Sequence, residues 1–135
     1  ILDRLDVFML EQHDVEKANT YVREVIETYS DDPEMLAMVG RKIALDPQYD
    51  ASMRDMDLAL EATEAARTYS EPGDPRFLAY EAEIRFARGE LDRAIELQEQ
   101  AYFMAMPRRK AEYRPMLDAY RIQQDASAKS QNDEG

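Results

Sequence analysis

Apolar residues recur at helical spacing along almost the whole chain. In one stretch the positions i, i+4, i+7 and i+8 are occupied by Ala18, Val22, Val25 and Ile26, which share one face of a helix. Sustained alternation of apolar and polar residues, the pattern typical of strands, is nearly absent. The periodicity predicts helices over residues 1–12, 15–29, 33–45, 55–69, 75–88 and 90–105, and a last helix that carries Tyr113, Met116, Leu117 and Tyr120.

Prolines, glycines and aspartates divide these helices. Asp32 and Asp74 each precede a proline, which predicts an N-cap followed by proline at the first helical position. Asp46 before Pro47 ends the third helix, and a longer polar loop follows over residues 46–53. Residues 70–75, Ser-Glu-Pro-Gly-Asp-Pro, form the clearest break in the chain.

The second helices of three successive helix pairs begin their inner face with a small residue. These residues, Ala18, Ala59 and Ala94, are separated by 41 and 35 residues. The third pair reads L-x3-A-x6-G-x4-AI-x5-AY-x4-P from Leu78 to Pro107. A two-helix unit near 34 residues with this pattern resembles the tetratricopeptide repeat.

This resemblance implies an all-α fold, a right-handed stack of about three antiparallel helix pairs. The pairs are expected at residues 1–32, 33–73 and 74–107, with a capping helix at about 110–124. Gly40 and Ala82 are expected to let the two helices of their pairs approach closely. His13 occupies the turn of the first pair, where Gly89 makes the turn of the third. Residues 125–135 contain no large apolar side chain and are predicted to be a disordered acidic tail.

A narrower resemblance covers roughly residues 35–120. The runs LAMVGRKIALDP, RDMDLALEATEAAR and GELDRAIELQEQA are similar to a bacterial helical-repeat module found C-terminal to thioredoxin-like thiol-disulfide domains. The resemblance implies that a redox CxxC motif lies upstream. The chain starts at Ile1 without a Met, which suggests a piece of a longer protein. No signal peptide is visible, and the compartment, bacterial cytoplasm or periplasm, stays open.

In the tetratricopeptide family, ligands lie in a groove lined by the first helix of each pair. Transferred by register, that resemblance implies a partner groove, with Arg41 and Arg76 orienting the ligand. Its candidate residues are Val7, Leu10, Arg41, Arg76, Ala79, Glu83 and Phe86. The cationic clamp of the chaperone-tail binders is not reproduced, since only the two arginines are cationic among acidic neighbours.

The amino-acid composition argues against most kinds of catalytic, metal-binding and nucleotide-binding site. The chain has 0 Cys and 1 His, and it lacks a Gly-rich phosphate loop. We therefore expect no catalytic residues, no cofactor and no metal site, and interpret His13 as a turn residue. A catalytic pair among the 29 acidic residues stays open, because its separation in space decides that chemistry.

The formal net charge of −12 disfavours nucleic acid and anionic membrane surfaces as partners. The cluster Arg108, Arg109 and Lys110 is expected to offset the dipole of the preceding helix. No apolar run is long enough to insert into a membrane.

The function predicted is a non-catalytic protein–protein interaction module, accessory to a thioredoxin-like parent, with a protein or peptide partner. The alternative is self-association, as a homodimer, or a structural spacer. Apolar residues at helix ends favour that alternative: Met53, Met56, Phe103, Met104 and Met106.

Overall fold

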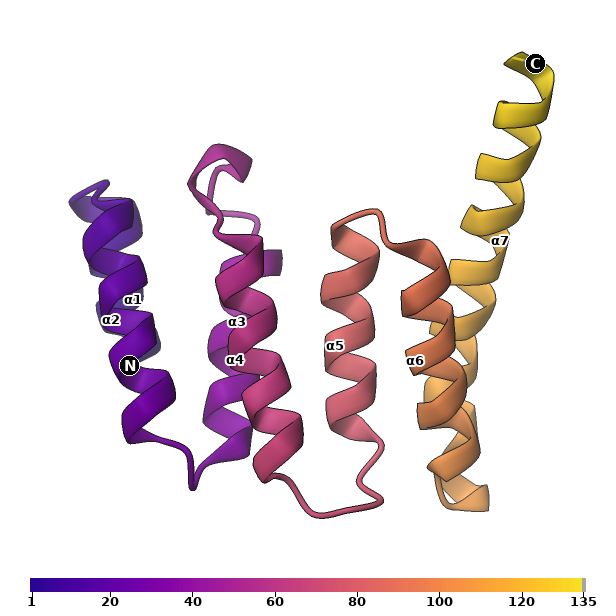
Figure 1. Ribbon diagram of the computed structural model, residues 1–135, viewed down its shortest axis with the longest axis horizontal. Coiled ribbons are helices and arrows are strands. Elements are labelled where there is room, and N and C mark those ends of the chain that lie inside the picture. The colour runs from indigo at the N-terminus through magenta and orange to yellow at the C-terminus, as the bar shows by residue number, and fades with distance from the viewer. Residues whose placement is uncertain (135) are drawn as a thin grey trace. The chain divides into compact units, whose positions relative to one another are not determined.

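The computed structural model describes residues 1–134, and every regular element in that range is helical, with no strand. The all-α prediction is therefore confirmed (Figure 1). The elements are α1 (Leu2–Asp6), the π-helical η1 (Val7–Glu11), α2 (Val15–Thr28), α3 (Pro33–Leu45), the 3₁₀ turn η2 (Ala51–Met53), α4 (Met56–Tyr69), α5 (Arg76–Ala87), α6 (Leu91–Met104), the 3₁₀ turn η3 (Pro107–Arg109) and α7 (Lys110–Glu134).

The chain folds as two compact units, Ile1–Glu71 and Pro72–Gly135, of which the second is described as far as residue 134. The boundary lies inside the Pro- and Gly-containing break that the sequence predicts at residues 70–75. The first unit contains α1, η1, α2, α3 and α4, and the second contains α5, α6 and α7.

Aspartate side chains start several helices. Asp14, Asp32 and Asp55 accept hydrogen bonds from the backbone N–H groups three residues later, at 3.0, 3.1 and 2.9 Å. These bonds satisfy N–H groups that have no partner inside the helix. The N-cap predicted at Asp32, with proline next, is confirmed. Asp74 acts slightly differently, because α5 begins at Arg76 and Asp74 accepts from that N–H at 3.0 Å.

The first predicted helix, residues 1–12, is divided in two. After α1 the backbone continues as the π-helix η1, in which Gln12 N–H donates to the Val7 carbonyl five residues earlier, at 2.9 Å. The wider turn carries Phe8. Its ring packs edge-on against the ring of Tyr21 in α2, with the ring centroids 5.6 Å apart. His13 follows at φ 51°, a left-handed conformation that suits glycine better. His13 is therefore a turn residue, as predicted.

In the first unit, α3 packs along α4 at a glycine. A Cβ atom on Gly40 would meet the side-chain oxygen of Thr63 and lie 2.7 Å from the Ala59 carbonyl oxygen. The Thr63 hydroxyl also donates to that carbonyl, at 2.9 Å, within α4. No side chain fits between the two helices at this point, which explains why the position is glycine.

In the second unit, α6 lies between α5 and α7, with α5 and α6 running in opposite directions (Figure 1). Small residues occupy the contact, since Ala82 and Ala94 are fully buried in its core. From α7, Tyr113, Leu117 and Tyr120 join this core. Of the four apolar residues that the sequence places on this last helix, these three are buried, and the fourth, Met116, is exposed. The core comprises Leu78, Ala82, Ala94, Ile95, Leu97, Ala101, Ala105, Tyr113, Leu117 and Tyr120.

The C-terminal segment differs from the prediction of a disordered tail over 125–135. Helix α7 continues through Glu134, while Gly135 lies outside the described residues. Residues 121–134 contain no proline or glycine and include several good helix formers, so they extend a helix that is already nucleated. Gln124 adds a side-chain hydrogen bond to Asp92 of α6, at 2.6 Å.

We expect Gly40→Ala to lower the free energy of unfolding by about 1–3 kcal/mol, because the methyl group is forced against the Ala59 carbonyl. At an ordinary helical site the same change would instead stabilise by about 1 kcal/mol. The sign of the change in urea denaturation therefore decides. An unchanged or raised stability would contradict the close approach of α3 and α4.

Candidate functional site

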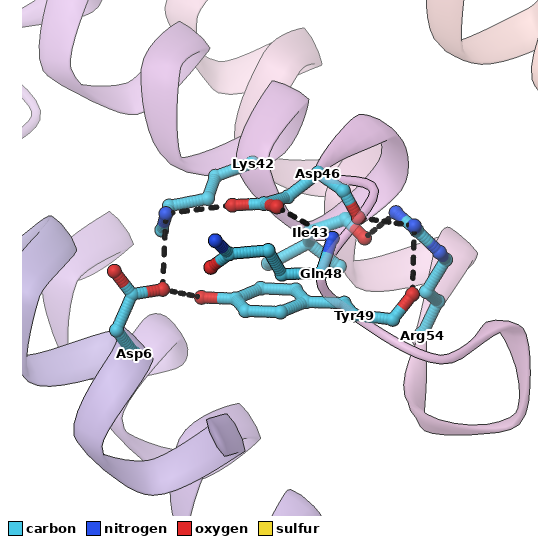
Figure 2. Close-up of polar contacts among 7 residues, drawn as sticks. All are labelled: Asp6, Lys42, Ile43, Asp46, Gln48, Tyr49 and Arg54. Carbon is cyan, nitrogen blue, oxygen red and sulfur yellow. Dashed lines mark hydrogen bonds and ion pairs between the residues drawn. The ribbon is translucent and has the colours of Figure 1, made fainter. Parts of the chain in front are cut away.

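A polar network in the first unit connects η2 and its loop to α1 and α3 (Figure 2). The side chain of Tyr49 is 2% exposed, and its hydroxyl donates to Asp6 at 2.7 Å. The Lys42 ammonium forms ion pairs with Asp6 at 3.0 Å and with Asp46 at 2.8 Å. Two carboxylates, an ammonium and a phenol thus connect α1, α3 and the loop after α3.

Arg54 holds the other side of the same loop. Its guanidinium donates to the carbonyls of Ile43 and Tyr49, each at 2.9 Å, and also to the carbonyl of Asp46. Carbonyl groups at the end of a helix lack intrahelical partners, and Arg54 provides one here (Figure 2). The loop predicted as polar and small is therefore fixed by one buried tyrosine and one arginine.

The network shifts the pKa values of its members. A hydrogen bond from Lys42, opposed by burial and aided by the Gln48 backbone N–H, holds the pKa of Asp46 below its ordinary value. Burial lowers the pKa of Lys42, but its bonds to Asp46 and Asp6 outweigh burial and raise it overall. Burial and then the bond to Asp6 raise the pKa of Tyr49 strongly. These groups satisfy one another, which indicates an anchor for the loop and not a reactive centre.

The second unit contains an open pocket of about 280 Å³. Residues from α5 form one side, α7 forms the other, and α6 contributes a single glutamine. The lining residues are Arg76, Ala79, Tyr80, Glu83, Gln98, Glu112, Tyr113, Met116 and Tyr120.

Two contacts fix the shape of this pocket. Gln98 of α6 is 2% exposed, and its amide donates to the Tyr113 carbonyl of α7 at 2.9 Å. Tyr120 stacks on Phe86 of α5, with ring centroids 4.7 Å apart. The pocket therefore lies between helices that are held both by a buried hydrogen bond and by aromatic packing.

Acidic side chains dominate the charge of the pocket. The guanidinium of Arg76 donates to both carboxylate oxygens of Asp74, at 2.9–3.2 Å, which balances its charge. Glu83 and Glu112 are the other charged lining residues. Burial first, then the charges of Glu112 and Asp74, raise the pKa of Tyr113. Burial first, then the charge of Glu83, raises the pKa of Tyr120 to about 12.

The structure brings together three of the predicted groove residues: Arg76, Ala79 and Glu83. Phe86, on the same helix, supports the pocket through Tyr120. The remaining candidates belong to the first unit. Arg41 lines a separate hollow there with Leu2, Met38, Lys42, Leu45, Asp46 and Pro47, and Val7 and Leu10 are half-buried residues of η1.

The contribution of α7 to the pocket was missing from the groove prediction. Tyr113, Met116 and Tyr120 have the i, i+3, i+7 spacing of a packing face, and the sequence predicts for them only a place on the capping helix. The signal available was the number of tyrosines on that face, because a hydroxyl group prefers a partially wet position to a dry core.

Lys110, one residue of the cationic cluster after α6, interacts with the end of that helix. The Lys110 ammonium donates to the carbonyls of Tyr102 and Phe103, at 2.8 and 3.2 Å, and so binds the negative end of the helix dipole as predicted. Beside it, Phe103 and Met106 are 71% and 61% exposed.

Within the described residues, no group of three or more His, Cys, Asp or Glu side chains is placed to hold a metal ion. None of the described helices combines the length and apolar character needed to cross a membrane. Comparison of the chain with protein-family models, with curated protein sequences and with solved structures gave no match.

We expect the Asp46–Lys42 ion pair to stabilise the fold above about pH 4 and to lose this contribution in acid. Because the pKa of Asp46 is lowered from 3.8 in the folded protein, the unfolded chain binds a proton first as the pH falls. Urea unfolding at pH 7 and pH 3 should show a smaller difference in stability for Asp46→Asn than for the wild type.

The exposed Asp50 on the same loop gives the control. Asp50→Asn should keep the pH dependence of the wild type. If both variants behave alike, the ion pair does not contribute to the acid sensitivity.

Proposed function

We propose that this chain is a non-catalytic interaction module that binds a segment of a partner protein in the pocket between α5 and α7. The pocket itself carries this proposal. It is open, it combines three tyrosines and a methionine with a few charged groups, and Tyr and Met are favoured where one side chain of a partner is received.

The scaffold supports the same conclusion. Helical hairpins with small residues at the contact are the building block of tetratricopeptide domains, and we propose that the chain is a domain of that kind. The sequence resemblance further supports a thioredoxin-like parent to which the module is an accessory. A chain without cysteine would then contribute client or partner binding, while the thiol chemistry belongs to the parent.

The structure changes the expected role of the two arginines. Arg76 is predicted to orient a ligand together with Arg41, and its guanidinium is engaged by Asp74. We therefore assign recognition to the tyrosine-lined pocket.

Filling the pocket should abolish binding. Peptides selected against the chain from a random display library should bind the wild type, and Ala79→Phe should weaken them by about 10-fold or more, as for loss of an interface anchor. The matched control is Ala87→Phe, because Ala87 is exposed on the same helix and does not line the pocket. Selected peptides that bind Ala79→Phe as well as wild type would contradict the proposal.

Self-association is the second candidate function, and the exposure of Phe103 and Met106 favours it. In that case the sedimentation mass should rise with concentration, and Phe103→Ser with Met106→Ser should restore the monomer. Tyr69→Ser, at another exposed aromatic residue, is the control. A monomer mass at every concentration would remove this candidate.

A further inference from the structure

Large apolar side chains are exposed at the corner of the second unit where α6 ends and α7 begins (Figure 1). Phe103, Met104 and Met106 are all exposed there, while Ala105 between them is buried. Single exposed apolar residues are common on proteins, but a contiguous group of them marks a surface that binds another molecule. We call this the corner surface, and it consists of Phe103, Met104, Met106, Arg108 and Arg109.

The ring of Phe103 is exposed but held in place. It packs edge-on against the ring of Tyr102, with the ring centroids 5.4 Å apart. The Lys110 ammonium lies 5.8 Å from the centroid of the Phe103 ring and donates to the Phe103 carbonyl at 3.2 Å. A side chain that is positioned before binding loses less conformational entropy when a partner arrives. Phe103 therefore has the properties of an aromatic anchor of an interface.

Positive charge borders these apolar residues. Residues 103–114 contain four cations and one acidic residue, although the formal charge of the whole chain is −12. Contacts within the chain account for two of the cations. Lys110 binds carbonyls at the end of α6, and Arg114 forms an ion pair with Asp118 one turn later in α7.

The two arginines of the 3₁₀ turn η3 are placed differently. Arg108 and Arg109 are exposed, and within residues 1–134 neither guanidinium forms an ion pair. Arg109 acts on Asp74 only through its charge, and the hydrogen bonds and charge of Arg76 do more to lower the pKa of that carboxyl. The helix dipole explains the position of Lys110 but not that of these two side chains, which are open to carboxylates of another molecule.

The charge of the corner surface argues against a second copy of the chain as its occupant. In a symmetric dimer the same surface lies on both sides of the interface. Arg108 and Arg109 would then be brought close to their own copies, and like charges that meet across an interface are unfavourable. Acidic groups beside apolar side chains satisfy both parts of the surface instead.

The acidity of the rest of the chain favours a compact occupant. At physiological ionic strength charges are screened beyond about 8 Å, so a short segment on the corner surface interacts mainly with Arg108 and Arg109. An anionic membrane or a nucleic acid extends past the surface and meets the acidic remainder of the chain. The distribution of charge therefore favours a short acidic segment over an extended anionic partner.

We propose that the corner surface binds a segment of a partner polypeptide in which large apolar side chains are flanked by Asp or Glu. The apolar side chains pack on Phe103, Met104 and Met106, and the carboxylates pair with Arg108 and Arg109. This inference goes beyond the proposed function, because the residues of the corner surface are not among those that line the pocket between α5 and α7. The two docking sites can therefore be tested separately.

The test uses the acetylated peptide amide Glu-Glu-Leu-Phe-Glu-Glu as the probe. Its counterparts are Gln-Gln-Leu-Phe-Gln-Gln, which lacks the charge, and Glu-Glu-Ser-Ser-Glu-Glu, which lacks the apolar side chains. Titration followed by ¹H–¹⁵N NMR should shift the amide signals of Phe103, Met106 and Arg108. We expect the probe to bind at least about 5-fold more tightly than either counterpart, and its advantage over the Gln peptide should shrink as salt is added. Equal affinity for the three peptides, or no shift at the corner surface, would overturn the inference.

Variants separate the apolar part of the surface from the charged part. Phe103→Ser should weaken the probe by about 10-fold, as for loss of an interface anchor. Arg108→Gln and Arg109→Gln should each weaken it by about 3-fold and leave the Gln peptide unaffected. The controls are Ile122→Ser, because Ile122 is 69% exposed and Phe103 71%, and Lys129→Gln, which removes an exposed cation elsewhere on α7. If a control weakens the probe as much as its partner variant, the corner surface is not the binding site.

The other occupants give different results. Ala79→Phe, which fills the pocket, should leave binding of the probe unchanged, and a loss of binding there would place the acidic segment in the pocket and overturn the inference. A dimer that Phe103→Ser dissociates and the probe leaves intact would identify a second copy as the occupant. Phosphatidylserine vesicles that bind the chain through Arg108 while the probe does not would identify a membrane. Either result would overturn the acidic segment, and neither bears on the pocket.

Discussion

The close approach of helices at small residues is the constraint on which both units depend. Between α3 and α4 the backbone of Ala59 occupies the space where a Gly40 side chain would be. In the second unit the corresponding contact between α5 and α6 uses Ala82 and Ala94, both fully buried. Dispersion and apolar burial are strongest where helices pack without gaps.

The pocket of the second unit lies between these helices. Phe86 of α5 meets Tyr120 of α7 by stacking. At the other end, Gln98 provides a buried hydrogen bond to the α7 backbone. Between these two points α7 does not close against α5, and the opening is lined by the hydroxyl-bearing rings and the charged groups. A site formed in this way is preorganised by the same residues that form the core.

The features that the sequence predicts correctly are those determined by residues close to one another in the chain. The cap at Asp32, the break at 70–75, the turns at His13 and Gly89 and the order of the helices each depend on residues close to one another in the chain. The π-helix η1 is not predicted by the periodicity, and the contact of its Phe8 with Tyr21 involves two different helices. The helical extension beyond residue 124 was missed because low hydrophobicity was interpreted as disorder, although helix propensity alone continues an existing helix.

In the candidate site, too, the sequence predicts the features that depend on neighbouring residues of one helix but not those that depend on contacts between helices. Register along α5 placed Arg76, Ala79 and Glu83 together, because residues three and four apart share a helix face. The partners from α7, and the neutralisation of Arg76 by Asp74, depend on three-dimensional contacts that periodicity does not encode. Likewise the role of Arg54, bound to three carbonyls of a preceding segment, has no signature in the spacing of apolar residues.

The hydrogen bonds from Arg54 to backbone carbonyls affect how easily proteases can cleave the long loop after α3. Cleavage requires a stretch of backbone to leave its partners and extend into an enzyme cleft. Here Arg54 binds the carbonyls of Asp46 and Tyr49, and the Tyr49 ring is buried beneath the loop. Residues 47, 48 and 50–52 are exposed on the surface. The backbone beside them is nevertheless held by the hydrogen bonds from Arg54 and by the buried Tyr49 ring. We therefore expect this loop, which the sequence shows only as long and polar, to resist proteolytic cleavage in the folded protein.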